Sequence, residues 1–234
     1  MRTIQFFNGE IYHIYNRGVD KKIIFENDSD RLRFIHNLFE FNDTAPAFNL
    51  GRRISKAEFL ALKKERPKRE LLVEILAFCM MPDHYHLLIK QLRRGGITKF
   101  LHKLGTGYTL YFNKTRKRKG SLFESRFKAV PVIKENHLFH LFYYIHLNPL
   151  DLIEPEWRRG EIKNSSQAID FLLNYRWSSL LDYLGKKNFP SLTQRDLLSK
   201  FVNGKDLKEN IKKWLQKMEI DQIIPLLLEP PITD

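Results

Sequence analysis

The feature that most constrains this chain is a pair of apolar segments separated by a short break. Residues 71–80, Leu-Leu-Val-Glu-Ile-Leu-Ala-Phe-Cys-Met, form an almost unbroken apolar run of strand length. Met81-Pro82-Asp83 interrupts this run, and residues 84–90 resume it. Short apolar runs bounded by a turn signal are typical of strands buried on both faces. The sequence therefore predicts two adjacent, tightly joined strands in the centre of a sheet.

Other apolar patterns predict the elements that accompany this pair. Strands are expected at 11–16 and 122–130, and helices after an Asn27 cap, from 97 to 112 and, after an Asn136 cap, from 137 to 147. Gly105 and Gly107 are expected to weaken the middle helix. The order of strand, helix, strand, strand, helix, strand and helix predicts an α+β fold, with helices packed on a mainly antiparallel sheet.

Two regions depart from this pattern. Residues 43–70 are expected to be an insertion, a charged loop that holds one short helix. Residues 151–234 are expected to form a C-terminal extension of loops and helices, with amphipathic stretches near 193–203 and 205–219. Residues 1–150 would then hold the sheet as one domain.

The charge balance favours a polyanionic partner. The chain has 40 Lys and Arg against 27 Asp and Glu, which gives a formal net charge of +13. Its single cysteine, Cys79, cannot form an intrachain disulfide or a zinc site of several thiolates. No export signal or membrane-spanning apolar stretch is indicated. We therefore expect a cytoplasmic protein with no membrane partner.

Two histidines at a spacing of two are candidate metal ligands. His84 and His86 lie in the second strand of the central pair, where the period of two places both imidazoles on one face and Tyr85 on the other. Two neutral imidazoles directed at one point make half of a metal site. The alternative is a surface pair, or a pair of buried histidines with structural partners.

The helix at 137–147 carries a candidate nucleophile. His140, Tyr144 and Asn148 are four residues apart and are expected to share a helical face, so that Tyr144 can attack and Asn148 can bind a metal. Tyr143 has the same intrinsic chemistry on a neighbouring face. The alternative is that these tyrosines only pack, because most tyrosines on helices do so.

A basic segment follows the middle helix and is a candidate nucleic-acid surface. Aromatic side chains precede it, so cations and stacking faces lie together, as single-stranded nucleic acids require. The alternative is a solvated loop. The cations are Lys114, Arg116, Lys117, Arg118 and Lys119, with Arg126 and Lys128 beyond them.

Four ordered blocks resemble a known family. They are residues 12–18 (Tyr-His-Ile-Tyr-Asn-Arg-Gly), 81–88 (Met-Pro-Asp-His-Tyr-His-Leu-Leu), 120–128 (Gly-Ser-Leu-Phe-Glu-Ser-Arg-Phe-Lys) and 144–149 (Tyr-Ile-His-Leu-Asn-Pro). In this order they resemble the single-tyrosine transposases of the HUH superfamily, above all the REP-associated branch. The resemblance covers about residues 8–150, and Trp177-Ser178-Ser179 with Tyr183 is similar to a trailing motif of that branch.

The resemblance implies both a fold and a chemistry. The fold is a ferredoxin-like antiparallel sheet with packed helices. By position, His84 and His86 match the metal-binding histidines, Asn148 matches the third ligand of a Mg²⁺ or Mn²⁺ ion, and Tyr144 matches the nucleophile. The tyrosine of this family attacks DNA and forms a 5′-phosphotyrosine link, so strands are cleaved and rejoined without ATP.

The resemblance also implies partners. Family members act on single-stranded DNA next to hairpins, so Arg17, the cations of the 114–119 loop, Arg126 and Lys128 are candidate contacts to the DNA backbone. The family includes monomers and dimers, so a homodimer is possible. A DNA partner further implies a nucleoid-associated protein.

Two other functions stay open from the sequence. The first is a binding module of the same ancestry, which recognises hairpin nucleic acid without chemistry. The second is a metal-dependent nuclease in which water attacks in place of tyrosine. The complete ligand set favours the transposase.

Overall fold

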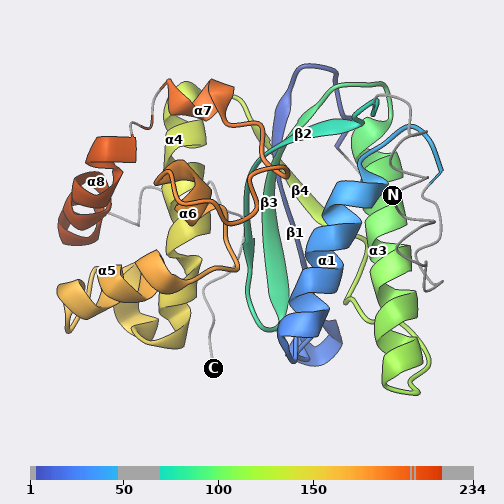
Figure 1. The fold of residues 1–234 in the computed structure, drawn as a ribbon, viewed down its shortest axis with the longest axis horizontal. Helices are drawn as coiled ribbons and strands as arrows, with labels where there is room; N and C mark the ends of the chain where they lie inside the picture. Colours follow the sequence, from blue (N-terminus) through green and yellow to red (C-terminus); the bar gives the residue numbers. More distant parts are fainter. Residues whose placement is uncertain (1–3, 47–68, 201, 203, 218–234) are drawn as a thin grey trace.

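The fold is built on a four-stranded antiparallel sheet. The computed structural model describes residues 4–46, 69–200, 202 and 204–217, so most of the expected insertion at 43–70 lies outside the described residues. The strand order is β2-β3-β1-β4, which is ferredoxin-like as expected (Figure 1). The strands are β1 (Ile11–Arg17), β2 (Val73–Met80), β3 (His84–Gln91) and β4 (Lys128–Val132).

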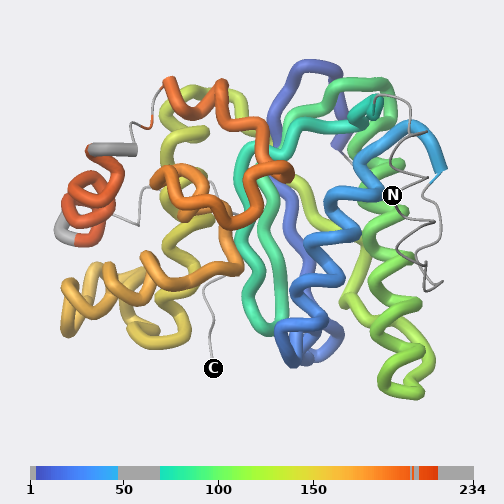
Figure 2. The backbone as a smooth tube through the Cα atoms, viewed as in Figure 1, coloured from blue at the N-terminus to red at the C-terminus, as the bar shows by residue number. Residues whose placement is uncertain are grey.

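Helices cover both faces of this sheet. Helices α1 (Asp28–Phe41) and α3 (Gly96–Thr115) lie on one side, and α4 (Glu135–Leu147) with the C-terminal helices lies on the other (Figures 1 and 2). The C-terminal helices are α5 (Ser165–Asn174), α6 (Leu180–Tyr183), α7 (Asp196–Ser199) and α8 (Gly204–Lys217). Each side has its own apolar core. No helix in the described parts of the chain is long and apolar enough to cross a membrane.

Two predicted boundaries were wrong. The last strand begins at Lys128, because residues 122–127 run past the end of β1 instead of continuing β4: the amide of Val19 donates to the carbonyl of Leu122 and that of Glu124 donates to the carbonyl of Arg17. Helix α4 begins at Glu135 after Lys134, which provides no side-chain cap. Asn136 therefore lies within the first turn.

The turn between β2 and β3 is held by the segment that follows β1. The carbonyl oxygen of Pro82 accepts from the amides of Ile24 and Phe25 at 2.9 and 3.0 Å, and the amide of Gly18 donates to Asp83 at 2.8 Å. A Cβ atom at Gly18 would lie 2.2 Å from the carbonyl oxygen of Lys22, so only glycine fits this close approach. These hydrogen bonds to Pro82 and Asp83 therefore fix the position of His84 at the start of β3.

Helix α3 runs unbroken through both of its glycines and packs on α1. A Cβ atom at Gly107 would lie 2.5 Å from the Phe41 ring, and Phe41 is a buried residue of α1. The same atom at Gly105 would meet nothing within 4 Å. Gly107 therefore allows the two helices to approach, whereas Gly105 only lowers the helical propensity of α3.

We expect opposite effects from alanine at these two positions. Gly107→Ala forces the Phe41 ring out of place and should destabilise the protein by about 1–3 kcal/mol, whereas Gly105→Ala should stabilise it by about 0.5–1 kcal/mol. Urea unfolding of the two variants beside the wild type measures both values. Equal effects would contradict the role given to Gly107.

The C-terminal segment closes the open edge of β2. The amide of Met80 donates to the carbonyl of Trp177 at 2.9 Å, and the amide of Ser179 donates to that of Phe78 at 3.0 Å. The Ser179 hydroxyl accepts from the Phe78 amide at 3.0 Å and lies 2.7 Å from Nε2 of His146. Nδ1 of His146 lies 2.8 Å from the carbonyl oxygen of Phe142, so Nδ1 carries the proton and Nε2 accepts from Ser179. The buried hydroxyl thus joins β2 to α4.

Removal of this hydroxyl should loosen α4 from the sheet. We expect Ser179→Ala to destabilise the protein by about 1–3 kcal/mol, because Nε2 of His146 and the Phe78 amide both lose a buried partner. Ser166→Ala, at an exposed position of α5, is the matched control and should stay near the wild type. Thermal unfolding of the pair measures the difference. A Ser179→Ala protein as stable as the control would contradict this role.

Candidate active site

The two candidate histidines lie on the sheet face that α4 covers. In the register of β1 with β3, Arg17 lies opposite His84 and Tyr15 opposite His86. The two imidazole rings are 5.0 Å apart between centroids, and Tyr85 is buried in the core on the opposite face. The structure thus brings the two imidazoles together, as their spacing predicts.

His86 is fully buried and has one nitrogen without a partner. Its Nδ1 lies 3.0 Å from Nε2 of His13, and its Nε2 has no hydrogen-bond partner among the described residues. Burial lowers the pKa of His86 well below its usual value, and the charges of His84, His13, Arg158 and Arg17 lower it further. His86 is therefore neutral at pH 7. A buried neutral imidazole with an unpaired nitrogen has the chemistry of a metal ligand.

His13 is a contact that the sequence analysis missed. Its ring stacks on that of His86 at 5.2 Å, and burial, assisted by His137, lowers its pKa to about 3. As a neutral partner it can accept the Nδ1 proton of His86, which leaves the lone pair of His86 on Nε2. The sequence signal for this contact is the period of two in β1, which places His13 on the same strand face as Tyr15 and Arg17.

His84 is oriented by a carboxylate. Its Nδ1 lies 2.5 Å from Oδ1 of Asp83, and Oδ2 of Asp83 lies 3.1 Å from Nε of Arg17. Burial alone would raise the pKa of Asp83, but the hydrogen bond and charge of His84 and the charge of Arg17 lower it. Asp83 is therefore ionised and accepts the Nδ1 proton, so Nε2 is the nitrogen of His84 that can bind a metal.

Tyr144 faces these histidines from α4. Its ring centroid lies 5.7 Å from that of His86 and 6.2 Å from that of His13, both nearly edge-on. Asn148 follows the helix directly, and its Nδ2 donates to the carbonyl of Tyr144 at 2.7 Å. Tyr144 and the histidines thus converge from one helix and two strands, and Asn148 is bound to the backbone of Tyr144.

Tyr143 and His140 point elsewhere. Tyr143 stacks on Trp214 of α8 at 4.9 Å, and His140 packs on the same ring at 5.4 Å. His140 therefore does not join the cluster around Tyr144, although the four-residue spacing places the two side chains on adjacent turns of α4.

An arginine that the sequence analysis did not single out completes this cluster. Arg158 lies in a short 3₁₀ helix (Pro155–Arg159), and its guanidinium carbon is 4.9 Å from the centroid of the Tyr144 ring. It donates to Oδ1 of Asn148 at 2.9 Å and to Oδ2 of Asp151 at 2.8 Å. No motif marks this position. Its ion pair with Asp151, seven residues earlier, arises only once the chain has folded.

The cluster fits a divalent cation. His84 and His86 each present an Nε2 lone pair, and the orphaned Nε2 of His86 is the observation that supports the fit. Within the described ranges there is no group of three or more histidine, cysteine, aspartate and glutamate side chains that could hold a metal. The remaining candidate ligand is the amide oxygen of Asn148, which accepts from Arg158.

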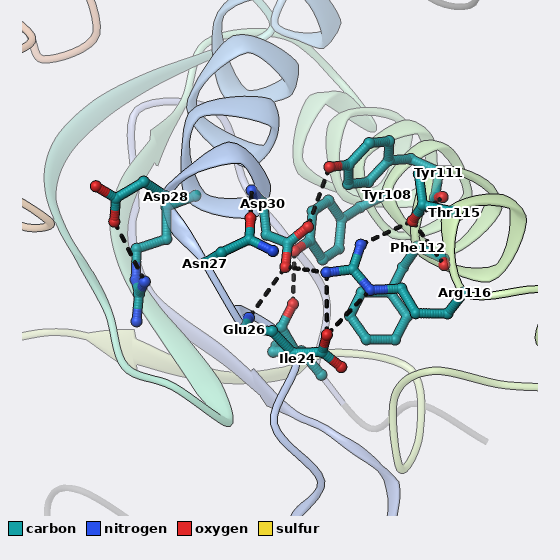
Figure 3. Close-up of polar contacts among 11 residues, drawn as sticks. Ile24, Glu26, Asn27, Asp28, Asp30, Tyr108, Tyr111, Phe112, Thr115 and Arg116 are labelled. Carbon is teal, nitrogen blue, oxygen red and sulfur yellow. Dashed lines mark hydrogen bonds and ion pairs between the residues drawn. The ribbon is translucent and has the colours of Figure 1, made fainter.

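The candidate DNA-binding cations divide into two groups. Lys114, Lys117, Lys119, Arg126 and Lys128 are exposed. Arg116 instead bonds Asp30 and Glu26, and the Tyr111 hydroxyl donates to the same Asp30, so these side chains join α3 to the start of α1 (Figure 3). Arg118 donates to Asn113 at 2.9 Å and to the carbonyl of Ser121. Arg17 is half-buried beside Asp83.

Part of the chain matches the model of a known family. Residues 56–148 match the family model described as "Transposase IS200 like", a range that contains His84, His86, Tyr144 and Asn148. The resemblance to the single-tyrosine transposases is thus confirmed over these residues. No curated protein matches the chain.

The chain is also similar, at low identity, to a solved structure. That structure is described as "Structure of the REP associates tyrosine transposase bound to a REP hairpin". The identity is 15% and the TM-score 0.44, over 84% of this chain and 92% of the other.

Proposed function

We propose that this protein is a metal-dependent DNA transposase that cleaves and rejoins single-stranded DNA near hairpins through a 5′-phosphotyrosine link on Tyr144. The observation that carries the proposal is the position of Tyr144, edge-on to His86, whose buried Nε2 has no partner among the described residues. The IS200-like family match spans the same residues.

The residues have separate tasks in this reaction. His84, His86 and Asn148 would hold Mg²⁺ or Mn²⁺, which when bound neutralises charge on a non-bridging phosphate oxygen. The Tyr144 hydroxyl loses its proton and its oxygen forms a bond to phosphorus. The bond from phosphorus to the 3′ oxygen breaks, and that oxygen takes up a proton to become a free 3′-OH. One phosphodiester replaces another, so the reverse attack reseals a strand.

The exposed cations define the surface on which the DNA would lie. The segment from Glu124 to Lys128 runs along the end of β1, where the Glu124 amide donates to the Arg17 carbonyl and Asn16 donates to the Ser125 carbonyl at 3.2 Å. Nζ of Lys128 lies 5.6 Å from the centroid of the Tyr15 ring, on the strand face that carries His86. A strand held by these cations would pass the start of β3, where His84 lies.

The nucleophile can be tested with matched tyrosine variants. Tyr144→Phe should abolish a Mn²⁺-dependent covalent adduct with labelled hairpin oligonucleotides from the DNA that flanks the gene. Tyr143→Phe is the control and should keep the adduct, because Tyr143 faces Trp214 and not the histidines. A denaturing gel with Mn²⁺ or with EDTA resolves the adduct from free DNA.

The other outcomes of this experiment separate the alternatives. An adduct that persists in Tyr144→Phe would contradict the assignment of the nucleophile. Cleavage by the wild type without an adduct would indicate the hydrolytic nuclease. Binding without cleavage or adduct would indicate the non-catalytic module.

The division of the cations can be tested by the salt dependence of binding. The double variant Lys117→Gln, Lys119→Gln should lower the slope of log affinity against log salt by about 1.4, the value for two contacts to a single strand, without loss of stability. Arg116→Gln should instead lower the unfolding temperature and change the slope little, because Asp30 and Glu26 already bind Arg116. Fluorescence anisotropy at several salt concentrations measures the slopes. A larger fall of the slope in Arg116→Gln than in the lysine double variant would contradict this assignment of the cations.

A further inference from the structure

Arg158 makes more contacts than a structural ion pair requires. Its Nε and Nη2 both donate to the carboxylate of Asp151, at 3.1 and 2.8 Å, which already forms a two-point pair. Nη2 also donates to Oδ1 of Asn148 at 2.9 Å, and the guanidinium carbon lies 4.9 Å from the centroid of the Tyr144 ring. The additional contacts of Arg158 thus reach Asn148, the proposed metal ligand, and Tyr144, the proposed nucleophile.

Its neighbour Arg159 shows what an ordinary arginine does in the same short helix. Arg159 pairs with Glu156 at 2.8 Å and its side chain is 76% exposed, whereas that of Arg158 is 22% exposed. The guanidinium of Arg158 also lies over the Trp157 ring, and Trp157 donates its indole N–H to Asp151. Arg158 is therefore held by groups outside the site and presents the second N–H of Nη2 to Asn148.

The contact from Arg158 uses one of the two lone pairs of the Asn148 oxygen that would bind a cation. The Nδ2 group of Asn148 is fixed by the Tyr144 carbonyl, so the amide cannot turn and its Oδ1 has a single direction. A guanidinium and a divalent cation are both positive, and each at Oδ1 repels the other. Arg158 and the cation therefore compete through their charges at one oxygen.

We propose that Arg158 is a positioning residue that holds Tyr144 and Asn148 for attack on DNA and restrains cation binding to the free protein. This inference rests on the proposed transposase function. It makes two predictions of opposite sign: loss of Arg158 should tighten the binding of a divalent cation to the free protein, and it should slow adduct formation. A merely structural arginine would weaken both.

The first measurement is a Mn²⁺ titration of the full chain without DNA, with free Mn²⁺ followed by electron paramagnetic resonance. Arg158→Gln should bind Mn²⁺ about tenfold more tightly, the scale on which groups around metal ligands act. Arg159→Gln removes the same charge one residue away and should leave the affinity unchanged. Affinity of Arg158→Gln equal to or weaker than that of the wild type would overturn the competition for Asn148.

The second measurement is the single-turnover rate of adduct formation at saturating hairpin DNA and Mn²⁺. Arg158→Gln should be slower by about 100-fold, the cost of a displaced reacting group, while Arg159→Gln should match the wild type. Wild-type rates in Arg158→Gln would overturn the positioning role. If the wild type itself forms no adduct, the proposed function fails, and the Mn²⁺ titration still decides the competition.

A conservative variant keeps the proposal testable if Arg158→Gln does not fold. Arg158→Gln leaves Asp151 without its cation, so thermal unfolding is measured first. Arg158→Lys keeps the charge near Asn148 but lacks the planar fork. It should therefore bind Mn²⁺ as the wild type does and still form the adduct more slowly. Arg158→Lys with a wild-type rate would contradict the proposal even if Arg158→Gln does not fold.

Discussion

The antiparallel pairing of β1 with β3 is the constraint on which the rest of the site depends. Its register places Arg17 opposite His84 and Tyr15 opposite His86, with His13 one pair further along. A slip by one residue would turn each of these side chains into the core beneath α1 and α3. The buried partners on that face, Tyr12, Ile14 and Tyr85 among them, oppose such a slip because their burial would be lost.

The second requirement is that α4 stays over the histidine face. Among the described residues, α4 packs on β2, β3 and β4, and side chains of the C-terminal segment join the same apolar core. Trp157, Leu172, Tyr183 and Ile211 belong to the same apolar core as α4. Ser179 then adds a directional bond to His146, two residues beyond Tyr144. The C-terminal extension is therefore part of what holds the candidate nucleophile in place.

The sequence predicted the local features of the site and missed those that need tertiary contacts. The shared face of His84 and His86 follows from the period of a strand, and that period is independent of the surroundings. His140 lies outside the site because its contact is Trp214, and the local pattern cannot show which element a helix residue meets. Arg158 and His13 were missed for the same reason: their roles depend on partners such as Asn148 and His86.

The positive side chains of the described residues include arginines that are paired with acids and lysines that are exposed. The net charge of +13 suggests one broad basic surface, but the arginines at the site and in the framework are bound to acids or carbonyls. Arg17 pairs with Asp83, Arg116 with Asp30 and Arg158 with Asp151. A planar guanidinium can bond two acceptors at fixed angles, so it suits positions where geometry must be held. Lysine is a flexible point charge, and Lys114, Lys117 and Lys119 are exposed. The arginines therefore hold fixed positions in the fold, and the lysines supply the exposed charge that the proposed binding of DNA requires.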